Sequence, residues 1–256
     1  MKVLERGRPF VVTFDASELD VENLGVSLSA SLLLSVLRKK VSESPLINSL
    51  WKTEFKGFKH PERLVELNSD GKNLSLDSEI LFGADGINSK VRDELLGKQN
   101  IKDYRQVAIS SSIEMDRSNE RVAYQVFNKS GSIALIPAGG NTYVGIQCVD
   151  KSYAKKLLEL DDDSYRQSFL EAFGDRFGNF LSTGARISYP LLGMRSRLIS
   201  KPGVIILGNA CNTLHPVAAQ GLNLAFRDVS TAMTLIKEHA ADEKGFELRY
   251  SKERKL

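Results

Sequence analysis

Two short stretches of the chain combine glycines with polar residues in an order that could hold a ligand. The first is GADGINSKVR, residues 83 to 92, which follows an apolar run. The second is LGNACNTLHPVAAQGLNLAFRD, residues 207 to 228, which begins where another apolar run ends. Glycine lets the backbone approach a ligand closely, and the free N–H groups at the start of a helix attract anions such as phosphate. Each stretch therefore indicates a strand, a loop and a helix arranged around a bound group.

The first stretch places an acidic loop before a polar helix. Asp85 and Gly86 follow the end of the strand, and the segment from Ser89 to Arg92 begins a helix whose N–H groups could face phosphate. The same residues also fit a plain strand-to-loop turn in which the aspartate caps the backbone. A single Gly-x-Asp-Gly pattern does not separate these two interpretations.

The second stretch continues from strand through loop into a longer helix. After the apolar run that ends at Gly208 comes a polar loop with His215 and Pro216, and Gln220 and Gly221 then open a segment of helical periodicity. The alternative is a buried strand-to-helix turn without a ligand, in which a hydrogen-bonded His215 is only a packed residue. The helix is expected to be anchored in the core by Leu222, Ala225, Phe226, Val229, Met233 and Ile236.

Helix and hairpin signals precede the first stretch. Residues 26 to 40 place leucines at helical spacing and end in Arg38, Lys39 and Lys40, cations that favour a helix C-terminus. Asp70-Gly71 separates two alternating runs, which predicts a β-hairpin that leads into a further strand near Ile80.

The middle of the chain reads as a sheet followed by a helix. Several alternating runs between Gln106 and Val149 predict an antiparallel sheet. An acidic segment that begins at Asp161 then precedes an apolar stripe, which predicts a helix packed on the core. That stripe consists of Tyr165, Phe169, Leu170, Phe173 and Phe177.

Composition bounds the class of protein. The 256 residues are 42% hydrophobic and 26% charged, as in a soluble globular protein of one or two domains. The formal charge of +3 is spread without a basic block, so nucleic acid is not an expected partner. Cys148 and Cys211 lie outside metal-ligand spacing, so we expect reduced thiols and no metal site. No segment reads as a membrane span or a signal peptide, and we expect a cytoplasmic protein.

Taken together and in this order, the two stretches resemble the flavin-dependent aromatic-ring hydroxylases, and within them the ubiquinone-biosynthesis hydroxylases of the 2-octaprenyl-6-methoxyphenol hydroxylase type. The resemblance covers nearly the whole chain and includes AYQVFNKSGSIALIPAGGNTYVGI, from Ala123. It implies an α/β fold in which an antiparallel-sheet substrate domain is inserted into a Rossmann-like domain that binds FAD and NAD(P). The implied parts are residues 1–104 and 196–256 for the flavin domain and 105–195 for the substrate domain.

The resemblance also implies roles for individual residues. Asp85 and Gly86 would lie near the FAD pyrophosphate and take part in using the nicotinamide. Gly208 and Asn209 would contact the ribityl chain; many relatives carry Asp at the second position, but Asn can still donate and accept hydrogen bonds there. The further positions expected at the cofactor are Arg92, His215, Pro216, Gln220, Gly221 and Asn223.

The implied reaction is hydroxylation of an electron-rich phenol ring by an FAD-dependent monooxygenase with NAD(P)H as reductant. Because the cofactor carries the chemistry, no side chain is expected to be catalytic. A polyprenylated phenol substrate would need an apolar channel, for which residues 133 to 136 and the segment near Tyr189 are candidates, although both also fit ordinary sheet packing. Such a substrate would favour a peripheral position at the inner face of the membrane.

The chain departs from the family where the dinucleotide-binding fold usually begins. Relatives open with a strand, a GxGxxG turn and a helix, whereas this chain contains no GxGxxG and also stops before the relatives' last helices. We therefore expect a partial Rossmann-like domain without its first βαβ unit, with an open apolar seam. Three interpretations remain: an inactive fragment, half of a split enzyme completed by a missing N-terminal half, or a non-catalytic scaffold that binds other ubiquinone-biosynthesis proteins.

Overall fold

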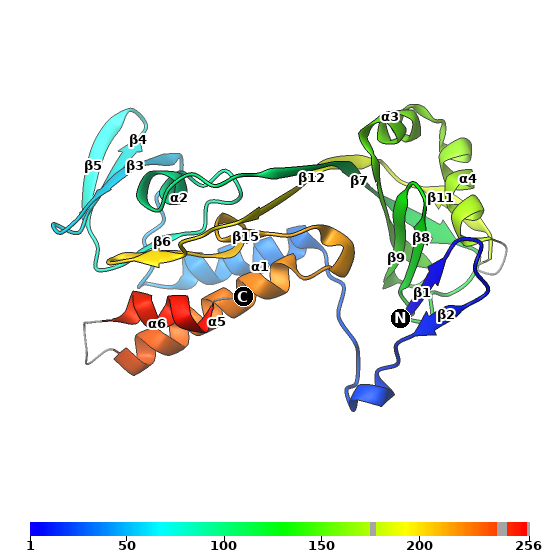
Figure 1. The fold of residues 1–256 in the computed structure, drawn as a ribbon, viewed down its shortest axis with the longest axis horizontal. Helices are drawn as coiled ribbons and strands as arrows, with labels where there is room; N and C mark the ends of the chain where they lie inside the picture. The colour runs from blue at the N-terminus through cyan, green and yellow to red at the C-terminus, as the bar shows by residue number, and fades with distance from the viewer. Residues whose placement is uncertain (175–177, 240–244, 255–256) are drawn as a thin grey trace. The chain divides into compact units, whose positions relative to one another are not determined.

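The computed structural model describes residues 1–174, 178–239 and 245–254. Within it the chain forms two compact units, each made of two separate segments (Figure 1). The first unit contains Met1–Ser44 and Arg105–Leu191, and the second contains Pro45–Tyr104 and Leu192–Leu256. The three-part division expected from the resemblance stays a prediction. No helix among the described residues is long and apolar enough to cross a membrane.

The first unit is built on one sheet whose neighbouring strands are antiparallel, apart from the parallel pair of β1 and β8. This confirms the antiparallel sheet predicted between Gln106 and Val149. Ile133 and Leu135 are almost fully buried in the core. Leu135 also lines a pocket of this unit, and the apolar channel expected along residues 133 to 136 stays a prediction. From β7 onward the spatial order is β7 (Lys102–Met115), β10 (Thr142–Asp150), β9 (Gly131–Gly139), β8 (Tyr124–Asn128), β1 (Lys2–Glu5) and β2 (Val11–Thr13). On the other side of β7 the sheet continues through β12 (Ile187–Arg195), and β11 (Phe180–Thr183) also pairs with β7.

Two helices, α3 (Lys151–Glu159) and α4 (Asp162–Phe173), pack against this sheet (Figure 1). Asp161 caps α4, because its carboxylate accepts a hydrogen bond of 2.7 Å from the Ser164 N–H. The predicted helix is confirmed: Tyr165, Phe169 and Phe173 are buried, while Phe177 lies outside the described residues.

The predicted N-terminal helix is present as α1 (Ala30–Glu43), which follows a short 3-10 turn at Ser17–Leu19. It begins four residues later than predicted because Ser29 is extended and its hydroxyl caps the Leu32 N–H. None of its residues is buried, and Leu32, Leu34, Val36 and Leu37 are about half exposed.

The second unit holds two small sheets and the helices that flank the two glycine-containing stretches. The first sheet is antiparallel and contains the predicted hairpin, which turns at Asp70 and Gly71 with φ of 49° and 81°. In the second sheet β14 and β6 are parallel, as in nucleotide-binding folds. The two sheets are β3 (Thr53–Lys59), β4 (Leu64–Ser69), β5 (Lys72–Asp77) and β13 (Ser200–Lys201), β14 (Val204–Ile206), β6 (Leu81–Gly83).

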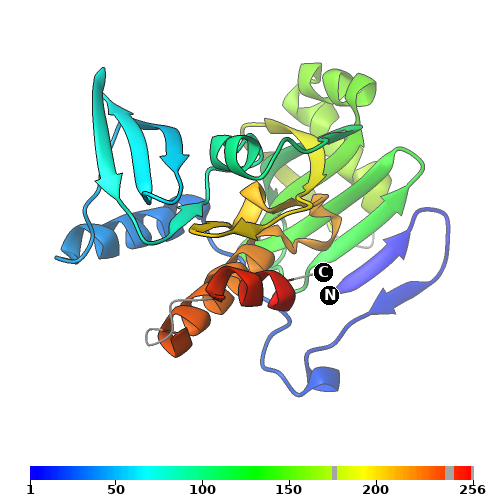
Figure 2. The same cartoon turned by 60° about the vertical axis from the view of Figure 1, so that its left-hand side comes forward.

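The remaining elements of this unit lie along the two stretches. Figure 2 shows α5 and α6 side by side. Buried residues from both helices pack on Ile205 of β14. β12 (Ile187–Arg195) runs from the first unit into the second, where it pairs with β15 (Asn212–Thr213). The helices are α2 (Lys90–Leu95), α5 (Gly221–His239) and α6 (Phe246–Glu253), with 3-10 turns at Gly208–Ala210 and Pro216–Ala218.

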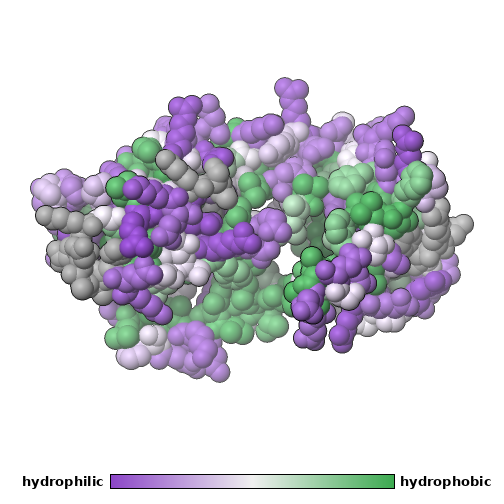
Figure 3. Space-filling model, turned by 60° about the horizontal axis from the view of Figure 1, so that its bottom comes forward, coloured by the Kyte–Doolittle hydropathy of each residue, from purple (hydrophilic) through white to green (hydrophobic). Residues whose placement is uncertain are grey.

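The core-facing side of α5 differs from the expected one. Leu222, Phe226, Val229 and Met233 are 46% to 52% exposed, so the expectation that they anchor the helix was wrong. The buried side of the helix contains Asp228, Ala232 and Leu235 instead, and Ile236 packs at its edge. Both sides of α5 are apolar, so periodicity alone could not choose between them. Figure 3 shows hydrophobic residues, coloured green, on the surface of the molecule.

Candidate functional site

The first stretch forms a closely packed turn between β6 and α2. Gly83 is buried, and a Cβ added there would lie 2.8 Å from a Val91 methyl group, so only glycine lets α2 pack this closely. Gly86 has a φ of 85°, a left-handed conformation, and an added Cβ there would meet no heavy atom within 4 Å. The loop after β6 is therefore fixed on its inner side and open on its outer side.

Asp85 caps the start of α2. Its carboxylate accepts hydrogen bonds from the Ser89 hydroxyl and, at 3.2 Å, from the Val91 N–H, while the Ser89 hydroxyl accepts one from the Arg92 N–H at 2.9 Å. Two N–H groups that could have faced a phosphate are thus bound within the chain, and the expectation that they are free was wrong. The capping interpretation describes this turn.

Arg92 links the first stretch to the second. Its guanidinium is 1% exposed and donates hydrogen bonds to the Ile87 carbonyl at 2.8 Å and to the Ala210 carbonyl at 3.3 Å. It also pairs with Asp93 at 2.7 Å. These contacts are all with the protein, so direct contact between Arg92 and a cofactor stays a prediction.

The second stretch leaves β14 through a tight turn at Gly208–Ala210. Gly208 has a φ of 58°, and its N–H donates a 2.9 Å hydrogen bond to the carboxylate of Asp228 on α5. The Leu207 N–H donates to the Gly83 carbonyl at 2.8 Å, which ties the end of β14 to the end of β6. Asn209 is exposed at the outside of the turn.

His215 lies in the loop that follows. Its Nδ1 accepts a 3.2 Å hydrogen bond from the Val217 N–H, and its ring meets that of Tyr104 edge-on with 5.2 Å between centroids. Burial lowers the pKa of His215 below its usual 6.5, which favours the neutral imidazole. No local sequence pattern marks Tyr104, because it lies 111 positions earlier and outside both stretches.

The start of α5 is at the surface. Gln220 and Asn223 are exposed and contact each other through their side chains at 3.5 Å. A Cβ added at Gly221 would meet no heavy atom within 4 Å. A helix of this length presents partial positive charge at its first turn, so a planar group with negative charge could approach the backbone here.

The topology brings the two stretches together. β6 and β14 are parallel neighbours with Gly83 opposite Ile206, so Asp85-Gly86 and Gly208-Asn209 leave the sheet at the same edge. Open parallel sheets bind ligands at the carboxyl ends of their strands. The open space at Gly86 and Gly221 and the exposed amide of Asn209 fit the phosphate, ring and sugar-alcohol parts of a flavin nucleotide.

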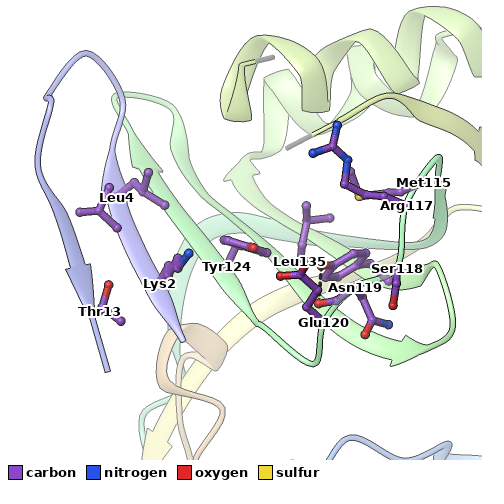
Figure 4. A pocket seen from close by; sticks show the side chains of 12 residues that line it. Lys2, Leu4, Thr13, Met115, Arg117, Ser118, Asn119, Glu120, Tyr124 and Leu135 are labelled. Carbon is purple, nitrogen blue, oxygen red and sulfur yellow. Dashed lines mark hydrogen bonds between the residues drawn. The ribbon is translucent and has the colours of Figure 1, made fainter. Parts of the chain in front are cut away.

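A separate pocket lies in the first unit (Figure 4). It has a volume of about 440 Å³ and lies between the β1–β2 hairpin and the loop after β7. Lys2, Arg117 and Glu120 bring charges to it, and Tyr124 and Tyr143 bring aromatic rings. Leu135 also lines the pocket and belongs to the segment 133 to 136 that was expected to line a substrate channel, whereas the other lining residues carried no such expectation.

Comparison with known proteins identifies the family. A family model described as an FAD binding domain matches residues 23–256. The chain belongs to this FAD-binding family. Both stretches lie within the matched residues. Together with the hydroxylases among the relatives, this match confirms the resemblance to flavin-dependent hydroxylases that was read from the two stretches.

Relatives in this family include ubiquinone-biosynthesis enzymes. The 3-demethoxyubiquinol 3-hydroxylase of Escherichia coli is 24% identical over 225 residues, which are 88% of this chain and 57% of that enzyme. Ubiquinone hydroxylase UbiL of Rhodospirillum rubrum is 30% identical over 163 residues, 63% of this chain and 37% of that enzyme. The chain spans less than two thirds of the length of these relatives.

Solved structures share the fold. The crystal structure of pqsL, a probable FAD-dependent monooxygenase from Pseudomonas aeruginosa, has a TM-score of 0.78 at 20% identity and is matched over 99% of this chain and 72% of that one. The flavin-dependent brominase Bmp2 has a TM-score of 0.73 at 17% identity, over 98% and 65% of the two chains. The mixed α/β fold with several sheets is thus that of FAD-dependent monooxygenases.

Proposed function

We propose that the chain supplies the flavin-ring side of an FAD-dependent monooxygenase that hydroxylates a phenolic ring in ubiquinone biosynthesis, with NAD(P)H as reductant. The parallel pairing of β6 and β14 carries this proposal, because it sets Asp85-Gly86 beside Gly208-Asn209 at one edge of the sheet. The names of the relatives in Escherichia coli and Rhodospirillum rubrum support the choice of substrate class.

The residues at this edge of the sheet and at the start of α5 would each have a role in binding FAD. When bound, FAD supplies the electron transfer and oxygen activation that no side chain can supply. Asn209 would hydrogen-bond a ribityl hydroxyl, and the first turn of α5 would stabilise negative charge on the reduced ring. Gly221 would leave room for the ring edge, and neutral His215 and Pro216 would shape the loop beside it. Gln220 and Asn223 would extend the polar lining at the helix start.

A second polypeptide segment would complete the sheet. β6 ends its sheet in the described part of the chain, Phe82 on it is 37% exposed, and α5 presents Leu222, Phe226 and Met233 to solvent. An unpaired parallel strand beside apolar helix surface favours a strand–helix–strand unit as the occupant. In the family such a unit carries the GxGxxG turn, and it would hold the adenosine part of FAD.

The substrate class implies a place of action. A polyprenylated phenol partitions into lipid, so the completed enzyme would work at the inner face of the membrane. Sedimentation with vesicles, together with a strong preference for polyprenylated over water-soluble phenols, is the expected result. Equal activity on both classes of phenol without sedimentation would contradict it.

The activity is tested by co-expressing the chain with the N-terminal strand–helix–strand unit of a ubiquinone hydroxylase. We expect NAD(P)H oxidation coupled to hydroxylation of a short-chain polyprenyl phenol, with neither half active alone. If the complex binds FAD but never hydroxylates a phenol, the proposed substrate class is wrong. If no flavin binds while the chain still associates with other ubiquinone-biosynthesis proteins, the chain is a non-catalytic scaffold.

A further inference from the structure

Two buried charged side chains meet the Gly208–Ala210 turn, one at each end. Asp228 on α5 and Arg92 on α2 are both 1% exposed, although neither residue type is usually buried so completely. The two side chains come from helices 136 positions apart in the chain, and each makes a hydrogen bond to the turn's backbone.

The Asp228 end of the turn is held by a carboxylate shared between two donors. One carboxylate oxygen accepts a 2.9 Å hydrogen bond from the Gly208 N–H. The other accepts a 2.7 Å hydrogen bond from the guanidinium of Arg254, the residue just after α6. Arg254 is itself only 11% exposed. Desolvation of such a pair is costly, so a buried ion pair is weak evidence for a purely stabilising role.

The Arg92 end is held by a carbonyl. One guanidinium nitrogen bonds both the Ala210 carbonyl and the Ile87 carbonyl, which lies in the loop after Asp85 and Gly86. The planar guanidinium presents its donors at fixed directions, so the distance between the two loops is set by one rigid group. Arg92 therefore joins the turn to the loop of the first stretch.

Only the middle residue of the turn is left to face outward. Gly208 and Ala210 are fixed through their backbones, and the Gly208 carbonyl accepts the Cys211 N–H at 2.9 Å. The Asn209 carbonyl accepts the Thr213 hydroxyl at 3.0 Å, which leaves its exposed side chain as the part that can meet a ligand.

We infer that Asp228 and Arg92 are positioning residues that clamp the Gly208–Ala210 turn so that Asn209 is held in place for the flavin. Through Arg254 the clamp also makes α6 a support of the flavin site. The inference rests on the proposed function for the identity of the ligand, whereas the clamp itself is a property of the flavin-free chain.

The test compares Asp228→Asn with Glu238→Gln. Glu238 pairs with Arg249 across the same two helices, α5 and α6, but that pair is about half exposed and does not reach the turn. For Asp228→Asn we expect faster hydrogen exchange and a shifted amide resonance at Gly208 in the flavin-free chain. We also expect FAD affinity to fall by about tenfold or more, the loss expected for a hydrogen bond to a charged group. Glu238→Gln should change neither.

A double variant separates positioning from folding. Asp228→Asn with Arg254→Gln leaves no unpaired buried charge, so it should regain thermal stability lost in Asp228→Asn while FAD affinity stays low. Arg92→Lys should lower FAD affinity too, because one ammonium replaces the rigid guanidinium. Wild-type FAD affinity in the double variant, or an unchanged Gly208 amide in Asp228→Asn, would overturn the clamp. If the wild-type chain never binds flavin, the proposed function fails, and the clamp is still decided by the Gly208 amide.

Discussion

Gly221 opens α5 without a side chain, at the position where the flavin ring would approach. A Cβ at this residue would meet no protein atom within 4 Å, so Gly221→Leu should fold normally and obstruct only the ligand. We expect flavin content to fall to near zero, as measured by visible absorbance after reconstitution with FAD and desalting. Gly25→Leu is the matched control, because Gly25 also faces open space. Normal flavin content in Gly221→Leu would show that the flavin ring does not bind at this junction.

His215 gives the site a dependence on pH. Burial lowers its pKa in the folded chain, so below the usual value of about 6.5 the unfolded chain binds this proton more readily. The stability tied to neutral His215 is therefore present above that pH and is lost as the pH falls below it. We expect His215→Asn, which keeps an acceptor for the Val217 N–H, to make the free energy of unfolding decrease less as the pH falls below about 6.5. Urea unfolding across the pH range measures this, and an unchanged slope would show that His215 is not the group responsible.

Some residues of the site could be predicted from the sequence and others could not. Asp85, Gly208 and Gly221 sit in local patterns of strand, turn and helix, and such patterns are visible within a few positions. Tyr104 and Arg254 reach the site only through long-range packing, so no local pattern marks them. Arg92 was singled out for a cofactor, yet its guanidinium donates to two carbonyls and pairs with a carboxylate of the chain itself.

The distance between β6 and α2 is set by a glycine. A Cβ at Gly83 would come within 2.8 Å of Val91 and 3.1 Å of Ile206, both well packed. We expect Gly83→Ala to lower the free energy of unfolding by about 1–3 kcal/mol, as overpacking does. Chemical denaturation measures the change, with Gly25→Ala as the control that should have little effect. An unchanged stability would mean that the packing of β6 on α2 is looser than described.

At the scale of elements, the sequence predicted which helices and strands exist better than how they pack. The hairpin at Asp70-Gly71 and the helix after Asp161 follow from turn and capping residues, which act locally. The buried side of α5 did not follow, since Phe226 and Leu235 are equally apolar and only the position of β14 decides between them. The fold class was predicted mainly from the resemblance, because periodicity alone does not give the order of strands.

At the scale of the whole molecule, the exposed side of α5 is the surface expected to bind the strand–helix–strand unit. Phe226 is 52% exposed, so Phe226→Ser should change the free energy of unfolding of the chain by less than about 0.5 kcal/mol. The same change should weaken association with the strand–helix–strand unit, because Phe226 would be buried there. Leu235→Ser, on the buried side, is the contrast and should cost about 2–5 kcal/mol in folding. Isothermal titration of the unit into each variant measures the association, and equal affinity for Phe226→Ser would rule out this surface.

The most direct test of the flavin assignment is the visible absorbance of the purified chain after incubation with FAD and desalting, alone and with the strand–helix–strand unit. If the edge formed by β6 and β14 holds the flavin ring, the completed protein retains about one flavin per chain, and Gly221→Leu retains none. A completed, folded protein that retains no flavin, or one whose flavin is unaffected by Gly221→Leu, would contradict the proposed site.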